Sequence, residues 1–227
     1  RSDLPATRES WLLLTDDEIV QTSEVYYVNE VDQEEAAFGR SLFHSNAGVT
    51  NEVVNGIFSN PNTNPILTTV RILSTCTRIT FDAGTITMIP DCIIELKSIQ
   101  DLDLSGNSLL TRISENLWNL TTLTRLTMGY CGLESLPEAI GNLINLNDLY
   151  VAGNSLTSLP VALGNLSNLE HLYVADNRLE SLPDTISNLR KLKELYLGSN
   201  RLTEVPDTLG ENLLDLELLV LGHNSLE

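Results

Sequence analysis

Histidine and cysteine, the side chains that most often carry acid–base, nucleophilic or metal chemistry, are rare in this chain of 227 residues. The histidines, His44, His171 and His223, are far apart, and none has a cysteine at a spacing typical of a catalytic or metal site. Asp101 and Asp103 offer two carboxylates but no third oxygen ligand for a calcium ion. The sequence has no phosphate-binding loop, nucleophile elbow or zinc-protease motif. We therefore predict that the chain is not an enzyme and holds no cofactor and no metal.

Three tyrosines indicate binding rather than catalysis. Tyr150, Tyr173 and Tyr196 follow one another at a constant interval, and each lies between two aliphatic residues. Alternate residues of a strand face opposite sides, so the tyrosines are expected to form a stripe on one solvent-facing surface. Tyrosine combines a large contact area with a polar tip and is enriched in binding hot spots. The alternative is that β-propensity and cross-strand pairing alone favour tyrosine on a solvated sheet.

Polar and charged residues flank this stripe at the same interval. One set lies two positions before each tyrosine or its equivalent, and a further acid lies three positions after Tyr173. The predicted protein-binding site consists of Tyr150, Tyr173, Tyr196, Asp148, His171, Glu194, Asp176 and Arg125. Since most of the charged members are acidic, we expect a partner that presents arginine or lysine.

The elements that position these residues come from a long internal repeat. A pattern L-x-x-L-x-L-x-x-N-x-L recurs along the chain, and in one copy a cysteine replaces the asparagine. The nearly evenly spaced positions of this residue are Asn107, Cys131, Asn154, Asn177, Asn200 and Asn224. A repeat of this length is typical of a solenoid, in which each unit packs only against its neighbours. The L-x-L triplet predicts a short strand, and a following proline predicts the start of a return segment with helical turns.

These residues resemble the leucine-rich repeat family, in its 23-residue class with the pattern L-P-x-x-[IL]-x-x-L-x-x-L-x-x-L-x-L-x-x-N-x-L. The resemblance covers residues 66–227, or about seven strand units. This class includes Ras-group proteins, polarity scaffolds such as Erbin and Scribble, and bacterial effectors. The resemblance implies an α/β fold, namely a curved solenoid with a parallel β-sheet on its concave side and short helices or 3-10 turns on its convex side. It also implies that the asparagines bond the backbone of adjacent turns.

The two ends of the chain are expected to differ. Residues 1–65 show no repeat, and Thr15–Glu18 reads as a capping box at the start of a helix. Because a solenoid end exposes its apolar core, we predict a helical N-terminal cap over 1–65, with an independently functional helical module as the alternative. Residues 66–227 form the repeat array. The sequence breaks off inside a unit, so the array is expected to continue beyond Glu227.

Composition restricts the partners. With 13 basic and 31 acidic residues the formal net charge is −18, which would repel nucleic acid and anionic membranes. No apolar run approaches the roughly 18 residues of a membrane span. Three cysteines, an odd number without paired spacing, favour a reducing compartment and hence a cytoplasmic location. A secreted effector or a cell-surface protein is the alternative.

The predicted function is a non-catalytic protein–protein interaction module that binds a protein on its concave face. By resemblance, the partner is a small GTPase, a phosphatase subunit or a host signalling protein. Two alternatives are the recognition domain of a larger enzyme or bacterial effector, and a surface receptor or adhesin.

Overall fold

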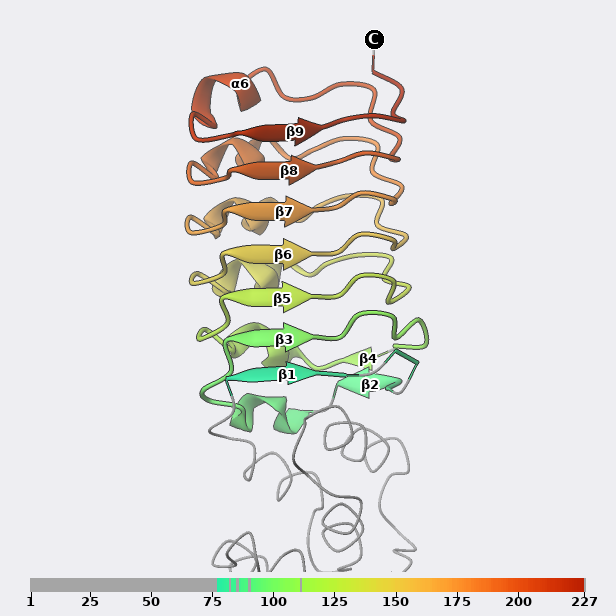
Figure 1. The fold of residues 1–227 in the computed structure, drawn as a ribbon, viewed down its shortest axis with the longest axis vertical. Coiled ribbons are helices and arrows are strands. Elements are labelled where there is room, and N and C mark those ends of the chain that lie inside the picture. The colour runs from blue at the N-terminus through green and yellow to red at the C-terminus, as the bar shows by residue number, and fades with distance from the viewer. Residues whose placement is uncertain (1–76, 82, 85, 90, 111, 227) are drawn as a thin grey trace, which may run out of the picture.

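Seven short strands lie side by side in one parallel sheet, in the order β1-β3-β5-β6-β7-β8-β9 (Figure 1). The structure is a computed structural model that describes residues 77–226 except 82, 85, 90 and 111. The predicted N-terminal cap over 1–65 and its boundary with the repeats lie outside these residues. The strands, in the order given, are Arg78–Thr80, Asp101–Asp103, Arg125–Thr127, Asp148–Tyr150, His171–Tyr173, Glu194–Tyr196 and Leu218–Val220.

The repeat period sets the register of the sheet. Neighbouring strands pair residues that are one repeat apart in the sequence, so that Leu149 pairs with Leu172 and Leu172 with Leu195. These three leucines are fully buried and belong to one continuous hydrophobic core between the sheet and the return segments. The predicted inward orientation of the L-x-L leucines is therefore confirmed, and the intervening residues face outward.

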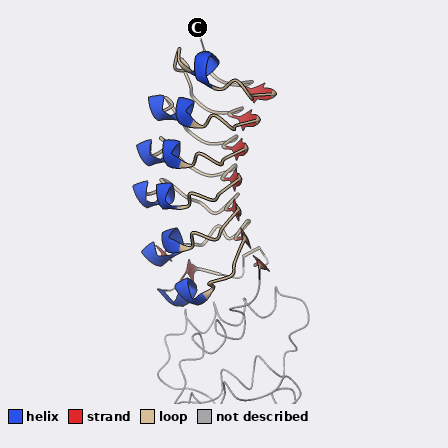
Figure 2. Ribbon diagram, turned by 90° about the vertical axis from the view of Figure 1, so that its left-hand side faces the viewer, coloured by secondary structure: helices blue, strands red, loops and turns tan. Residues whose placement is uncertain are grey.

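The return segments form a second layer behind the sheet. Figure 2 shows the strands along the inner side of the curved stack and the helices along its outer side. Most of these helices are single 3-10 turns: η2 (Asp91–Glu95), η3 (Glu115–Asn119), η4 (Glu138–Asn142), η5 (Val161–Asn165) and η6 (Asp184–Asn188). Proline precedes η4, η5 and η6 with extended backbone, as the sequence predicts, and fixes φ where each turn begins. The predicted leucine-rich solenoid architecture is confirmed.

Two units are one residue longer than the others, and they accommodate the extra residue in different ways. Between β8 and β9 it enlarges the turn, so that α6 (Leu209–Asn212) has α-helical bonds where η6 has 3-10 bonds. The amide of Leu213 donates to the carbonyl of Leu209 at 3.2 Å, four positions back rather than three. Between β3 and β5 the extra residue lies in the loop after the strand, where Leu109 is 64% exposed. In the same unit β4 (Arg112–Ile113) pairs with β2 (Met88–Ile89) of the preceding unit and forms a small second sheet.

Buried asparagines connect adjacent units through the backbone. The side-chain oxygen of Asn177 accepts from the amide of Leu156 at 3.0 Å, and its nitrogen donates to the carbonyls of Val151 and Val174, both at 3.0 Å. Asn154 and Asn200 repeat this arrangement. At the one ladder position where cysteine replaces asparagine, the Cys131 thiol donates to the carbonyl of Leu104 at 3.1 Å. Each asparagine oxygen thus satisfies an amide that the stack would otherwise bury without a partner, and the Val151 and Val174 carbonyls each accept from two asparagines.

Candidate functional site

The three predicted tyrosines stack against one another on the concave face. Tyr150 ends β6, Tyr173 ends β7 and Tyr196 ends β8, and the register places each beside the next. Both neighbouring pairs have ring centroids 4.4 Å apart and planes inclined by 14°. The strand spacing of about 4.8 Å in a sheet is close to the distance that an offset aromatic stack requires. All three residues are partly exposed, so the stack is accessible from the hollow of the solenoid.

The hydroxyl group of the middle tyrosine is also held in place. The Tyr173 hydroxyl donates a hydrogen bond to the carboxylate of Glu194, which begins the next strand. Burial, and secondly this bond, raise the pKa of Tyr173 far above the usual range of a tyrosine. Burial also raises the pKa of Tyr150. The phenols of these two residues are therefore neutral at physiological pH, and they present hydrogen-bonding groups without charge.

A row of charged residues runs beside the stack, two positions earlier on each strand. Arg78 bonds Asp101 through Nε at 2.8 Å and Nη2 at 2.6 Å. Arg125 bonds one oxygen of Asp148 through Nε at 3.0 Å and Nη2 at 2.8 Å, and its Nη1 lies 3.9 Å from Asp101. The other oxygen of Asp148 lies 2.5 Å from Nδ1 of His171. The row is thus a chain of internally paired charges.

This pairing changes what the predicted acids can offer a ligand. Asp148 is 8% exposed and both of its oxygens are engaged, so it holds Arg125 and His171 in place rather than presenting a free carboxylate. Its hydrogen bond is the main reason why the pKa of Arg125 is raised, and burial opposes the effect. Asp176 lies outside the strands, in the turn after β7, with a left-handed φ of 55°. It is exposed, and it forms no ion pair with any described residue.

Two features of this face were not assigned by the sequence analysis. One is the ion pair between Lys193 and Glu170, with Nζ and Oε2 2.6 Å apart, which lowers the pKa of Glu170. Opposite charges at equivalent positions of neighbouring repeats were the available signal. The other is a cavity of about 210 Å³, here named the Tyr150 pocket. It is lined by Arg78, Thr80, Asp101, Asp103, Arg125, Thr127 and Tyr150.

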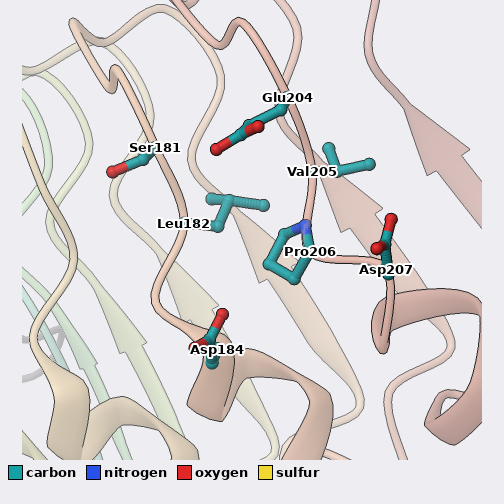
Figure 3. A pocket seen from close by; sticks show the side chains of 7 residues that line it. All are labelled: Ser181, Leu182, Asp184, Glu204, Val205, Pro206 and Asp207. Carbon is teal, nitrogen blue, oxygen red and sulfur yellow. The ribbon is translucent and has the colours of Figure 1, made fainter.

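A second hollow lies away from the concave face, between two neighbouring units (Figure 3). It has a volume of about 210 Å³ and is lined by Ser181, Leu182, Asp184, Glu204, Val205, Pro206 and Asp207. We name it the acidic pocket, because three of these residues are carboxylates. In the part of the chain that the structure describes, no group of three or more His, Cys, Asp or Glu side chains could hold a metal ion.

The thiol of Cys131 has no features of a reactive nucleophile. It is fully buried at a ladder position, donates to a backbone carbonyl, and burial raises its pKa. Cys76 and the side chain of Cys92 lie outside what the structure describes. No helix among the described residues has the length and apolar character needed to cross a lipid bilayer.

Sequence comparison agrees with this geometry. A family model for a leucine-rich repeat region matches residues 138–226, and one for a single leucine-rich repeat matches residues 98–120. The repeats of this chain belong to the leucine-rich repeat family. Its assignment to the Ras-group class within that family stays a prediction. No curated protein matches this leucine-rich repeat chain.

Solved leucine-rich repeat structures share its fold. A leucine-rich repeat protein from Leptospira interrogans has a TM-score of 0.56 and 21% identity, over 88% of this chain and 59% of that one. Internalin C2 from Listeria monocytogenes has a TM-score of 0.59 and 19% identity, over 84% of this chain and 85% of that one. The ectodomain of the plant membrane receptor kinase GASSHO1/SCHENGEN3 from Arabidopsis thaliana, solved in complex with CASPARIAN STRIP INTEGRITY FACTOR 2, has a TM-score of 0.54 and 31% identity, over 62% of this chain and 17% of the ectodomain.

The leucine-rich repeat fold is in general a protein–protein interaction module, and its members are typically non-catalytic. The fold alone does not specify a partner, because each repeat array carries its own set of outward side chains. The chain spans only 59% of the Leptospira protein and 17% of the plant ectodomain.

Proposed function

We propose that this leucine-rich repeat chain is a non-catalytic module that binds a protein partner on its concave face, across the stack of Tyr150, Tyr173 and Tyr196. The observation that carries the proposal is the stack itself. Three rings lie 4.4 Å apart in the hollow of the sheet, are partly exposed, and are held in one orientation by each other and by Glu194. Rigid aromatic side chains lose little entropy on binding, so such a surface suits a protein contact.

The charges support a partner with a basic surface. The net charge of −18 attracts cationic proteins over a distance of about 10 Å at moderate salt. Close to the surface, however, most charged side chains beside the stack are already paired with one another. The rings are therefore expected to contribute most of the affinity, while the overall charge mainly raises the association rate constant.

Partner binding by tyrosine variants tests the proposal. The chain is immobilised, a partner is captured from a lysate of the source organism, and its affinity is then measured with the purified partner. Tyr173→Ala should weaken binding by roughly 30-fold, the effect of losing a hot-spot side chain. Tyr173→Phe keeps the ring and should cost much less.

Tyr130→Ala is the matched control. This ring is 62% exposed and lies in the loop after β5, outside the stack. Its removal should leave the affinity unchanged, and circular dichroism should show that both variants keep the fold. An affinity that is the same in wild type and Tyr173→Ala would contradict the concave site.

A second candidate function is the recognition part of a larger receptor or effector. It is favoured by the 31% identity to a plant receptor ectodomain of which the chain spans 17%. The coding sequence on either side of this segment tests it: a membrane span, a kinase or another catalytic domain in the same reading frame would support it. A flanking sequence without any such element would contradict it.

A further inference from the structure

The Tyr150 pocket lies where the tyrosine stack ends. Tyr173 covers one face of the Tyr150 ring. On the other side, the register partner of Tyr150 is Thr127, which has no ring, and the partner of Thr127 is Asp103. With strands about 4.8 Å apart, a small group above Thr127 would contact the ring face on one side and the Asp103 carboxylate on the other.

Asp103 differs from Asp101 and Asp148 in having no cationic partner among the described residues. Its Oδ1 accepts from the amide of Ser105 at 2.9 Å, and its second oxygen has no hydrogen-bond partner among the described residues. By contrast, Asp101 is bonded to Arg78, and Asp148 is bonded to Arg125. The pocket therefore contains one carboxylate, that of Asp103, whose charge is not paired with a described arginine or lysine.

The way in which the charges around the pocket are paired also favours a cation. The two guanidinium groups of its lining, Arg78 and Arg125, are directed to Asp101 and Asp148. The lining holds two arginines and two aspartates, but Arg125 is bonded to Asp148 outside the pocket, so Asp103 is the lining charge that is left without a partner among the described residues. The hydroxyls of Thr80 and Thr127 add two neutral acceptors to the lining.

We propose that the Tyr150 pocket binds a lysine side chain of the protein partner, with the ammonium group between the ring face of Tyr150 and the carboxylate of Asp103. This proposal rests on the proposed function, because it places a part of the partner beside the stack. An ammonium group suits the position, since it donates in several directions and is attracted by an aromatic face. A guanidinium stacked on the ring would point its N–H groups sideways, away from Asp103, so arginine fits less well.

Small ligands test the pocket without the partner. The full chain, labelled with ¹⁵N, is titrated with the amides of Nα-acetyl-lysine, Nα-acetyl-arginine and Nα-acetyl-norleucine while ¹H–¹⁵N spectra are recorded. The lysine compound should give saturable shifts at Thr80, Asp103 and Thr127. The arginine compound should bind several-fold more weakly, and the norleucine compound, which lacks the ammonium group, should give no saturable shift.

Two variants test the two sides of the pocket. Asp103→Asn should weaken binding of the lysine compound roughly tenfold, because it removes a hydrogen bond between charged groups. Tyr150→Leu should weaken it about threefold, the size of an exposed cation–π contact. Both residues face outward, so either variant alone can test the pocket if the other fails to fold. Asp184→Asn, in the acidic pocket, should leave binding unchanged.

Three results would overturn the proposal: no saturable shift with the lysine compound, binding of the arginine compound at least as tight, or a loss of binding in Asp184→Asn. None of them bears on the tyrosine stack, because Tyr173→Ala is measured with the purified partner. The failure of the pocket and the failure of the concave site are therefore distinguishable.

Discussion

The phenol of Tyr173 has a different environment from those of its two neighbours in the stack. Its ring is covered on both faces, and its hydroxyl is bonded to Glu194. Tyr150 and Tyr196 each have a single stacked neighbour among the described residues, so each keeps one ring face for another group. The ring of Tyr173 therefore holds the other two in position, while each outer ring has one face that no described ring covers, against which a further group can stack.

Ionisation of Tyr173 should be delayed in the folded protein. Its folded pKa is raised above the unfolded value of about 10, so its contribution to stability is complete below pH 10 and is lost as the pH rises further, because the unfolded state releases its proton first. Tyrosinate absorbance against pH should rise later in the native than in the denatured protein. Tyr173→Phe should remove most of this lag. A native curve that superimposes on the denatured curve would contradict the stacked, hydrogen-bonded phenol.

The asparagine ladder makes a second prediction for a single residue. Asn177→Ala leaves the Leu156 amide without its acceptor, and it removes one of the two asparagine donors of each of the Val151 and Val174 carbonyls. We expect a loss of at least about 2 kcal/mol in the free energy of unfolding, measured by chemical denaturation. Asn145→Ala is the control, because that exposed side chain makes a single bond to the Thr121 carbonyl. Equal losses in both variants would contradict a special role for the ladder.

Among the elements, the return segments depend on small residues for their close spacing. A β-carbon at Gly164, in η5, would lie 2.7 Å from the β-carbon of Thr185, in η6, and closer still to its carbonyl oxygen. Gly141, in η4, is in the same position relative to Ala162, whose carbonyl oxygen would be 2.7 Å away. Glycine therefore allows the turns on the convex side to approach one another through their backbones.

Gly164→Ala should consequently force η5 and η6 apart. We expect a loss of roughly 1–3 kcal/mol in the free energy of unfolding, the usual cost of overpacking. Gly210→Ala is the matched control, because α6 has nothing within 4 Å of the added carbon and alanine is the better helix former. Thermal or urea denaturation checks both. If the Gly164→Ala protein were as stable as the Gly210→Ala protein, η5 and η6 would have space for the added methyl group, and the prediction would be wrong.

The stability of the sheet depends on the buried leucine side chains of its strands. Leu172 is fully buried between the equivalent leucines of β6 and β8. Leu172→Ala should lower the free energy of unfolding by roughly 2–5 kcal/mol, since it leaves a cavity that adjoining units cannot collapse into. Leu109→Ala, at a side chain that is 64% exposed, should have little effect. A denaturation midpoint that does not move in Leu172→Ala would mean that the core is not packed as described.

At the scale of the molecule, the period of the repeat made most of the architecture predictable. The constant step brings equivalent residues together on neighbouring strands, so the buried leucines, the asparagine ladder and the adjacency of the three tyrosines all follow from spacing. The structure places Asp148, His171, Glu194 and Arg125 on the same face, as the alternation of a strand requires. The role of these residues in binding stays a prediction.

What spacing could not predict depends on side-chain conformations and on single insertions. The sharing of Asp148 between Arg125 and His171 requires the reach of each side chain, which the pattern of residue types does not contain. The Tyr150 pocket arises because a threonine adjoins the row of tyrosines along the sheet. In one of the two longer units the extra residue lengthens the loop after β3. In the other, between β8 and β9, it converts a 3-10 turn into α6, and the repeat pattern alone does not distinguish these outcomes.

The bonds of Asn177 have a consequence for how such a protein can evolve. Because each unit presents to the next the same groups that it receives from the one before, duplication or loss of one whole unit in a gene would leave a new junction that is already complementary. Copying residues 154–176 would add one ring to the stack and one asparagine to the ladder, without a single point mutation. Recombination can therefore change the width of the aromatic surface by one repeat at a time, without any substitution of an individual side chain.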